Sequence, residues 1–505
     1  MKISKINIAR IITLLLTAAT LTSCNTSDNT DSTTAAKDAA TDAAGSTGEA
    51  TSERLKPDLS EADFGGAEIT IMGRALQDGG FVKYWSEVAS EEQNGETMND
   101  AVYKRNAYVE DKYNVRIKRL LVNDEGSLMA DLQKLIRSGD STVDAAIGGI
   151  HDNVGLSQGG LLTDLYNVPN LDLTKPWWDQ KSVSELSIGG KLYFAVGDIT
   201  PWANSFTHVV VFNKEMIQNY ELESPYELVR RNEWTFDKFY DYCKAVAGDT
   251  DGDGVITEFD RHGVMTANDI FTVNVIAGGE HIVKKDKDDL PYFAINNDRA
   301  LSVIAKVFEL MSDNTVSLNV NHYLSKYNDP WFEVLRAQFR NGNGLFYQGG
   351  LEQMLIFRDL DTPIGILPVP KFDSAQEEYY HTMVFYWASS LNIPITNSDP
   401  DRLNMTGHII EALAAESMYT VRPAYYDQTL TLKAMRDEES MEMLDIILAS
   451  RSYDLGYFYG WGGITGIFGD MISSGTMDFS SRYEKKEASA IKQMQVTVDK
   501  FLSLD

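Results

Sequence analysis

The first part of the chain with enough apolar residues to form a core alternates between strand-like and helix-like segments. Residues 67–73 alternate in hydropathy as a strand does, residues 97–112 carry apolar side chains at helical spacing, and residues 115–122 alternate again. A second helical segment at 127–138 then leads to a short apolar strand at 143–147. Strands and helices in this order predict an α/β fold built on a parallel sheet.

Ligands of such sheets bind beyond the carboxyl ends of the strands. Arg74 follows the first predicted strand, and His151 and Asp152 lie on the predicted loop after the third. Asn268 follows a later strand-like run, residues 263–267. These four residues are candidates for binding a ligand. Histidine and aspartate residues on loops are more often solvated than bound to a ligand, and Arg74 can equally pair with a carboxylate at the mouth of a cleft.

The N-terminus carries a short basic region, an apolar run at residues 11–16 and the sequence Leu21-Thr-Ser-Cys24. This pattern resembles a bacterial lipoprotein signal. In such signals the chain is cleaved before the cysteine, whose sulfur carries the lipid. The resemblance implies a signal peptide at residues 1–23 and a mature protein anchored outside the cytoplasm through Cys24. A membrane-spanning helix needs roughly 20 apolar residues, and this run is shorter.

Residues 24–58 are rich in Thr, Ser, Ala, Asp and Gly and have little to bury, which predicts a disordered tether. The remaining residues, 59–505, are too many for one hydrophobic core and indicate two lobes or domains. The formal net charge of −29 argues against nucleic acid as a partner.

The chain has two cysteines, so a disulfide framework is excluded once Cys24 carries a lipid. The second, Cys243, lies on the apolar face of a predicted helix at 235–247. We expect it to be a buried, unreactive thiol.

Residues 249–260, Asp-Thr-Asp-Gly-Asp-Gly-Val-Ile-Thr-Glu-Phe-Asp, match the pattern of a calcium-binding loop, with Gly254 at the sharp turn. A helix is predicted before the loop, but strand-like residues follow it, so we expect a structural ion rather than a calcium sensor. The alternative is an acidic surface turn without metal. The expected Ca²⁺ ligands are Asp249, Asp251, Asp253, the Val255 carbonyl, Thr257 through water, and Asp260.

Several landmarks follow one another in a characteristic order. They are Gly189-Gly-Lys-Leu-Tyr193, a strand ending in Phe212-Asn-Lys214, Trp234-Thr235 before a helix, Gly344-Leu-Phe-Tyr-Gln-Gly-Gly350, Ile364-Gly-Ile-Leu-Pro-Val-Pro370 and Leu391-Asn-Ile-Pro-Ile395. Their order and spacing resemble the bacterial extracellular solute-binding proteins of family 1. These are carbohydrate-binding lipoproteins that serve ATP-driven importers and are similar in fold to maltose-binding protein. The resemblance extends over nearly all of residues 65–505.

The resemblance implies a two-lobed periplasmic-binding-protein (Venus-flytrap) α/β fold with discontinuous lobes, three interlobe crossings and C-terminal helices. The expected ligand is then a sugar, preferably an oligosaccharide, held in the cleft between the lobes of a monomer. Closure on the ligand presents a shape that the permease of an ABC importer recognises. The lobes are expected at 59–200 with 371–417, and at 201–370 with 418–505, with crossings near Thr200, Pro368 and Ser417.

Sugar faces stack on aromatic rings, so aromatic residues whose neighbours leave them accessible are candidates for binding a sugar. Trp461 lies among small residues that are expected to expose it, and a tryptophan at this place in the chain stacks on sugar in the maltose-binding relatives. Trp202, Trp387 and Tyr347 are further candidates, whereas Trp234 and Trp331 are predicted to be core residues. Leu351 stands where the maltose-binding pattern has a tryptophan, which argues against maltose-like specificity.

The alternative function is a secreted, calcium-dependent carbohydrate-active enzyme. Gly155-Leu-Ser-Gln-Gly159 has the spacing of a nucleophile elbow, but the preceding strand is predicted to end too early. Acidic residues are plentiful, and nothing in the sequence selects a catalytic pair among them. We therefore expect a binding protein without catalytic residues.

Overall fold

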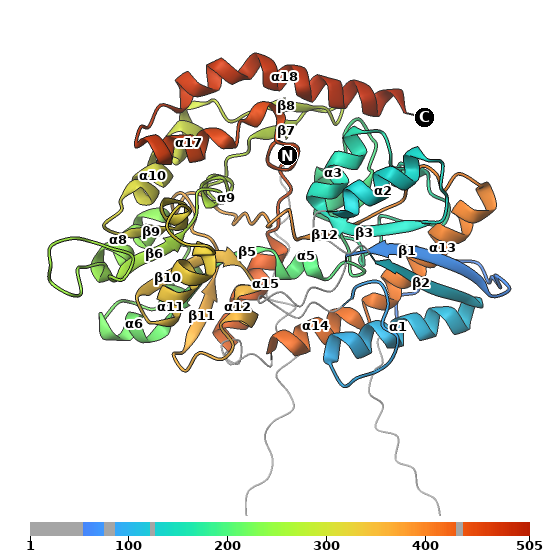
Figure 1. Ribbon diagram of the computed structural model, residues 1–505, viewed down its shortest axis with the longest axis horizontal. Coiled ribbons are helices and arrows are strands. Elements are labelled where there is room, and N and C mark those ends of the chain that lie inside the picture. Colours follow the sequence, from blue (N-terminus) through green and yellow to red (C-terminus); the bar gives the residue numbers. More distant parts are fainter. Residues whose placement is uncertain (1–53, 75–85, 122–126, 431–437, 505) are drawn as a thin grey trace, which may run out of the picture. The chain divides into compact units, whose positions relative to one another are not determined.

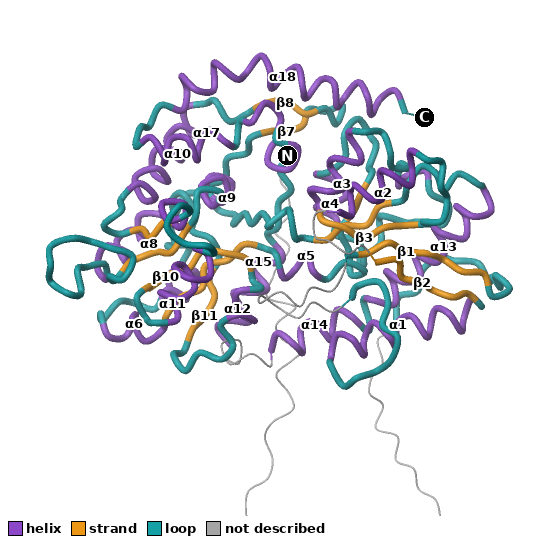
Figure 2. The backbone as a smooth tube through the Cα atoms, viewed as in Figure 1, coloured by secondary structure: helices purple, strands orange, loops and turns teal. Residues whose placement is uncertain are grey.

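Two five-stranded mixed sheets form the centres of two lobes in the computed structural model, which describes residues 54–74, 86–121, 127–430 and 438–504 (Figures 1 and 2). Residues 56–505 belong to one compact unit. The expected signal peptide, Cys24 and the tether up to residue 53 lie outside the described residues. None of the helices in the described ranges is long and apolar enough to cross a membrane.

The first sheet has the strand order β2-β1-β3-β12-β4. Its strands are β1 (Ala67–Gly73), β2 (Val115–Leu121), β3 (Ala145–Gly149), β4 (Phe194–Ala195) and β12 (Ser389–Asn392). β1 runs parallel to β2 and β3, as the sequence predicts, but β12 is antiparallel to both β3 and β4. The sheet is therefore mixed, because a strand from much later in the chain returns to it.

Helices cover the first sheet. α1 (Thr97–Tyr113) packs against α13 (Pro400–Ser417), and α2 (Ser127–Arg137) packs against α3 (Ile150–Gln158). The strand–helix order of residues 67–158 is confirmed. β3 continues to Gly149 and α3 begins at Ile150, so His151 and Asp152 lie in the first turn of a helix and not on a loop.

The second sheet has the strand order β11-β5-β10-β6-β9. Its strands are β5 (His208–Asn213), β6 (His262–Thr266), β9 (Ser317–Asn319), β10 (Gly344–Gly350) and β11 (Ile364–Leu367). β10 is parallel to β6 and antiparallel to β5. Every residue of β5 is buried, as expected for the apolar run of a strand that is covered on both faces.

On the second sheet, α8 (Phe236–Val246) packs against β6 and β10, and α10 (Asp298–Ser312) packs against β9 and against α9 (Ile270–Ala277). α8 begins where the Thr235 hydroxyl accepts a hydrogen bond from the Lys238 N–H, and its apolar face buries Cys243, as predicted. The shorter helices of the chain are α4 (Gln180–Glu185), α5 (Trp202–Ser205), α6 (Lys214–Asn219), α7 (Pro225–Arg230), α11 (Ala337–Arg340) and α12 (Gln353–Ile356).

The chain passes between the lobes through segments that lie side by side. The His208 N–H donates to the Thr382 carbonyl (3.0 Å), the His381 N–H to the Ser450 carbonyl (2.9 Å), and the Ser452 N–H to the His381 carbonyl (2.8 Å). The chain leaves the first sheet after β4 and enters the second sheet at β5. The second crossing does not lie at Pro368, whose carbonyl still accepts a hydrogen bond from the Trp234 indole within the second lobe.

The expected crossing near Ser417 also lies further along the chain. α14 (Val421–Leu430) still packs against α1 of the first lobe, and Gln428 Nε2 donates to Glu96 Oε1 (2.9 Å). α15 (Glu438–Ala449) packs against β11 of the second lobe. The chain therefore leaves the first lobe after α14.

The C-terminal helices are α16 (Leu455–Tyr459), α17 (Gly466–Ser474) and α18 (Phe479–Ser503). α18 contacts both α3 and the hairpin of β7 (Val283–Lys285) and β8 (Pro291–Phe293), over which it passes in Figure 1. Gln158 of α3 donates to the Thr497 hydroxyl of α18 (3.3 Å). The last helix thus packs on elements of both lobes.

Candidate functional site

A pocket of about 370 Å³ lies at the carboxyl ends of β6 and β10, where the sheet geometry places ligand sites of α/β proteins. β5 is antiparallel to β10, so its first residue lies at the same edge of the sheet. The segment before β12 supplies a further wall. The lining consists of Phe206, His208, Ala267, Asp269, Ile270, Asp329, Trp331, Leu335, Arg336, residues 347–350, Glu352, Gln353, Ile356, Val384, Tyr386 and Trp387.

Three aromatic side chains line the pocket and remain accessible. Trp331 is 38% exposed and Tyr386 is 53% exposed, and Trp387 is half-buried. Trp387 is supported from behind by Phe206, whose ring centroid lies 6.3 Å away in a stacked arrangement. Accessible, supported rings of this kind offer flat apolar surfaces to a ligand.

The first lobe contacts the aromatic wall through residues that the sequence predicted as candidates. Arg74 forms an ion pair with Asp152 (3.3 Å), and its guanidinium lies 5.5 Å from the centre of the Trp387 ring. It also donates to the carbonyls of Tyr386 and Trp387. The ring of His151 lies 4.6 Å from that of Tyr386. Arg74, His151 and Asp152 therefore position the aromatic wall, and none of them lines the pocket itself.

The polar side of the pocket is an extended hydrogen-bond chain. Arg336 Nε donates to Gln353 Oε1 (3.2 Å), and Gln353 Nε2 donates to Glu352 Oε1 (2.8 Å). Nearby, Gln348 Nε2 donates to Asn274 Oδ1 (2.8 Å). These contacts hold the amide and guanidinium groups in fixed orientations. Such groups suit the hydroxyl rim of a polar ligand.

Burial shifts the pKa values of several groups in the lining, among them Glu352 and His208. Glu352 is 8% exposed, and desolvation raises its pKa to about 7. His208 is buried, and desolvation lowers its pKa to about 4, so its imidazole is neutral at physiological pH. Neutral His208 adds no positive charge to the pocket.

Two of the aromatic residues predicted from the sequence, Tyr347 and Trp387, line the pocket. Asn268 lies beside it: its side chain accepts from Asn319 Nδ2 (2.8 Å) and its N–H donates to Asn321 Oδ1 (2.8 Å), which fixes the turn that carries Asp269. Trp202 is buried behind the pocket, with its ring 5.8 Å from that of Phe206.

Trp461 is not exposed by its small neighbours, and this expectation is wrong. Its side chain is 2% exposed, its ring stacks on Tyr459 at 4.8 Å, and its indole N–H donates to the Thr497 hydroxyl (2.9 Å). A Cβ at Gly462 would lie 2.4 Å from the Cβ of Ala490. The glycine thus lets α18 approach closely and cover the tryptophan.

The prediction that Trp331 is a core residue is also wrong, because its side chain is exposed. It lies in a π-helical turn, Trp331–Arg336, in which Val334 and Leu335 are buried while Trp331 and Phe332 are exposed. Four apolar residues within five positions exceed what one helical face can bury. That excess was the signal available in the sequence.

The acidic loop between α8 and β6 brings three of its predicted ligands together. Asp249, Asp251 and Asp253 are exposed, and one carboxylate oxygen of each lies within 4.8 Å of the others. Asp249 also accepts hydrogen bonds from the Gly252 and Gly254 N–H groups, which shapes the loop. Carboxylate oxygens in this arrangement are able to hold a hard cation.

Asp260, predicted as the closing ligand, lies apart from this group. Its carboxylate accepts four hydrogen bonds, from the N–H and hydroxyl groups of Thr250 and Thr257, at 2.7 to 3.0 Å. It is 2% exposed, and these bonds lower its pKa to about 2. The Thr257 hydroxyl is also engaged by Asp260, and Val255 is 59% exposed. Two residues within the loop, Thr250 and Thr257, thus already satisfy the Asp260 carboxylate.

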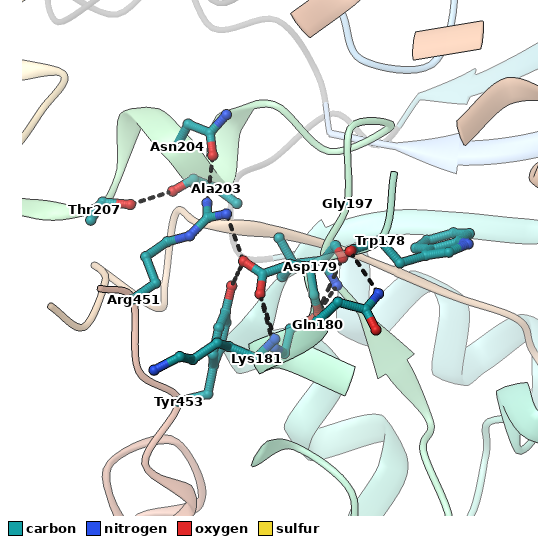
Figure 3. A network of polar contacts seen from close by, with 12 residues as sticks. Trp178, Asp179, Gln180, Lys181, Gly197, Ala203, Asn204, Thr207, Arg451 and Tyr453 are labelled. Atoms are coloured by element: carbon teal, nitrogen blue, oxygen red, sulfur yellow. Dashed lines mark hydrogen bonds and ion pairs between the residues drawn. The ribbon is translucent and has the colours of Figure 1, made fainter. Parts of the chain in front are cut away.

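A buried polar network joins the crossing segments to the first lobe (Figure 3). Arg451 pairs with Asp179 (2.6 Å) and donates to Asn204. The Tyr453 hydroxyl donates to the same carboxylate of Asp179 (2.8 Å). This network fixes the segment after α15 against the segments that precede α4 and β5.

Residues 89–401 match a protein family described as bacterial extracellular solute-binding protein. Among curated protein sequences, none matches the chain significantly. Several solved structures are similar to the chain. One is a cyclo/maltodextrin-binding protein complexed with maltotetraose, which has a TM-score of 0.55 at 14% identity, with 85% of this chain and 97% of that chain covered.

Two further structures are similar. The sugar-binding protein MalE from Xanthomonas citri has a TM-score of 0.55 at 12% identity, covering 86% of this chain and 97% of that one. The ABC substrate-binding protein Lmo0181 from Listeria monocytogenes, in complex with cycloalternan, has a TM-score of 0.52 at 13% identity, covering 86% and 97%. At these identities the likeness concerns the fold, and it confirms the expected two-lobed α/β architecture with C-terminal helices.

Proposed function

The chain belongs to the family of bacterial extracellular solute-binding proteins, and from this premise we propose that it binds an oligosaccharide in the pocket at the carboxyl ends of β6 and β10 and delivers it to an ABC importer. Membership of this family agrees with the expectation of a solute receptor rather than an enzyme.

The observation that carries this proposal is the pairing of accessible aromatic rings with fixed polar groups in one pocket. Trp331, Tyr386 and Trp387 offer faces for the C–H groups of a sugar ring, and Arg336, Gln353 and Glu352 offer donors and acceptors to its hydroxyl rim. The volume of about 370 Å³ is in the range of small-molecule pockets. Maltotetraose and cycloalternan in the complexes of two similar proteins support the same ligand class.

Delivery requires the importer to distinguish the ligand-bound protein from the free protein, which a change of conformation on binding makes possible. A ligand that binds a closed arrangement of the lobes more tightly than an open one shifts the population toward closure. The segments around Thr207, His381 and Ser450 are hydrogen-bonded to one another and are the natural axis of such a movement. The rim residues Arg74 and His151 contact the aromatic wall, so closure and ligand contact are coupled.

We also propose that Cys24 carries a lipid that anchors the protein outside the cytoplasm, with the permease subunits of the importer as its membrane partner. The basic region, short apolar run and Leu21-Thr-Ser-Cys24 sequence support this assignment. The protein then acts as a tethered monomer beside its permease.

For the acidic loop we propose a bound Ca²⁺ with a structural role. Asp249, Asp251 and Asp253 would hold it, with the Val255 carbonyl completing the set and Thr257 acting through water. The loop leads from α8 into β6, and its base is closed by hydrogen bonds between Gly248 and Arg261 (2.9 and 3.2 Å). The ion would therefore order the tip of the loop, whose residues are separate from the lining of the pocket.

The proposal is tested by incubating the purified protein with a panel of neutral and substituted oligosaccharides. Melting temperature reports binding, and chromatography of the recovered sugars reports chemistry. A raised melting temperature with unchanged sugars is expected. Released products would overturn the receptor function, and the absence of any shift across the panel would overturn carbohydrate binding.

A further inference from the structure

We propose that the pocket is selective for a sugar that carries a cationic amino group. This inference rests on the proposed function and adds the chemical class of the ligand. It follows from the balance of charged side chains in the lining and from one buried carboxylate oxygen without a partner.

Three carboxylic acids line the pocket, and they come from different elements. Asp269 belongs to the turn after β6, Asp329 precedes the π-helical turn, and Glu352 follows β10. Arg336 is the one arginine or lysine among the described lining residues. The three acids outnumber this one guanidinium, and a recess with an excess of acidic groups concentrates cationic ligands.

Among the three acids, Glu352 gives the strongest argument for a cationic ligand. It is 8% exposed, its Oε1 accepts from Gln353, and its Oε2 has no hydrogen-bond partner among the residues that the structure describes. Arg336 directs its Nε to Gln353, so the amide stands between the guanidinium and the acid in this chain of hydrogen bonds. A buried carboxylate without a full set of partners is costly, and an ammonium group with three N–H donors can offset that cost.

Asp269 and Asp329 are the other two acids that line the pocket. The side chain of Asp269 is accessible from the pocket yet surrounded by protein, and desolvation raises its pKa above the usual value. Asp329 Oδ1 accepts from the Phe332 N–H (3.1 Å), which holds this carboxylate at the start of the π-helical turn. A bound cation would favour the ionised form of Asp269.

The remaining titratable groups do not supply a competing cation. Burial lowers the pKa of His208 to about 4 and raises that of Tyr347 to about 12, so both are neutral at pH 7. At the rim, Arg74 is paired with Asp152. The accessible rings of Trp331 and Trp387 add an attraction for cations through their π-faces. An anionic sugar would meet repulsion in the same place.

The test compares sugars that differ in one substituent. Glucosamine and galactosamine, free and as β-1,4-linked disaccharides, are titrated calorimetrically at pH 7 beside their N-acetylated and neutral counterparts. We expect the amino sugars to bind at least tenfold more tightly than either counterpart. Equal or tighter binding of the neutral or acetylated sugars would overturn this inference and leave the proposed function standing.

Two variants assign the preference to the pocket. Glu352→Gln and Asp269→Asn keep the shape of each side chain and remove its charge, so we expect each to lower the ratio of amino-sugar affinity to neutral-sugar affinity about tenfold. Glu377→Gln, at an exposed glutamate that does not line the pocket, is the control. An amino-sugar preference that survives in both folded variants would overturn the inference. If no sugar of the panel binds the wild-type protein, the proposed function fails, and this inference with it.

Discussion

Arg451 and Asp179 form a buried ion pair, with Nη2 2.6 Å from Oδ2 and with side chains only 14% and 8% exposed. The pair joins the segment after α15 to the residue that begins α4, since Asp179 also accepts from the Lys181 and Ser182 N–H groups. It therefore ties a segment near the lobe crossings to the first lobe. Breaking one side of such a pair leaves a buried charge without compensation.

The first prediction concerns this pair. Asp179→Asn retains an oxygen for the N–H groups of α4 but removes the charge that faces Arg451 and Tyr453. We expect the free energy of unfolding in urea to fall by about 3 kcal/mol. Asp288→Asn is the matched control, because Asp288 pairs with Lys287 on the surface, where both side chains are more than half exposed. Its loss should stay below about 1 kcal/mol, and equal losses in the two variants would contradict the role of burial.

The second prediction uses two neighbouring aromatic residues. Trp331 lines the pocket, whereas Phe332 is 56% exposed and does not. Stacking of a sugar on an aromatic ring contributes on the order of 1 kcal/mol, so Trp331→Ala should weaken oligosaccharide binding about tenfold, as measured by calorimetry. Phe332→Ala should leave the affinity unchanged. Because both side chains are exposed, neither variant should alter the melting temperature of the free protein much, and an equal loss of affinity in both would show that Trp331 does not contact the sugar.

Elements with strong periodicity could be predicted from the sequence, and contacts across the chain could not. The order β1, α1, β2, α2, β3 follows from local hydropathy, because each of these segments buries one face or both. The burial of Trp461 depends on Gly462 and Ala490, which lie on different helical segments and meet only when α18 packs. The exposure of Trp331 depends on the π-helical turn, which shifts the apolar residues away from the expected 3.6-residue spacing.

The sequence likewise predicts some of the aromatic residues of the site but few of its acidic residues. Tyr347 stands in a family landmark and Trp387 precedes the landmark at Leu391, and both line the pocket. Asp269 follows the same strand-like run as the candidate Asn268, whereas nothing in the local sequence distinguishes Asp329 and Glu352 from the many other acidic residues of the chain. Only the fold of the second lobe brings them together. The crossing near Ser417 was placed too early for a similar reason, since the packing of α14 on α1 is a contact between distant segments.

The third prediction concerns the acidic loop. Adding Ca²⁺ to metal-free protein should raise the melting temperature, in proportion to the logarithm of the ion concentration once the site is filled. Asp251→Asn should abolish that increase, because it removes one of the three clustered carboxylates. Asp241→Asn, at an exposed residue of the preceding helix, should keep it. Sugar affinity should be the same with and without the ion, and a loss of binding in Asp251→Asn protein that still melts at its original temperature would place the ion in the ligand site.

The fourth prediction concerns the pH dependence of stability. Glu411 is 1% exposed, accepts hydrogen bonds from the indoles of Trp177 and Trp178 at 3.0 Å, and has its pKa raised to about 7 by burial. Between the ordinary pKa of a glutamate, near 4.5, and pH 7, the unfolded chain releases this proton while the folded protein keeps it. The stabilisation is therefore complete below about pH 4.5 and is lost as the pH rises through 7, by an amount on the order of 3 kcal/mol.

Glu411→Gln removes this titration. The free energy of unfolding of the variant should consequently fall less than that of the wild type between pH 5 and pH 7.5, although the variant is less stable at every pH because one indole loses its acceptor. Burial also raises the pKa values of Glu87 and Glu352 to about 7, and they titrate alike in both proteins, so the difference between the two pH profiles isolates Glu411. Glu377→Gln, at an exposed position, should reproduce the wild-type profile. Parallel profiles for the wild type and Glu411→Gln would show that Glu411 is ionised in the folded protein, with its charge held by the two indole N–H groups.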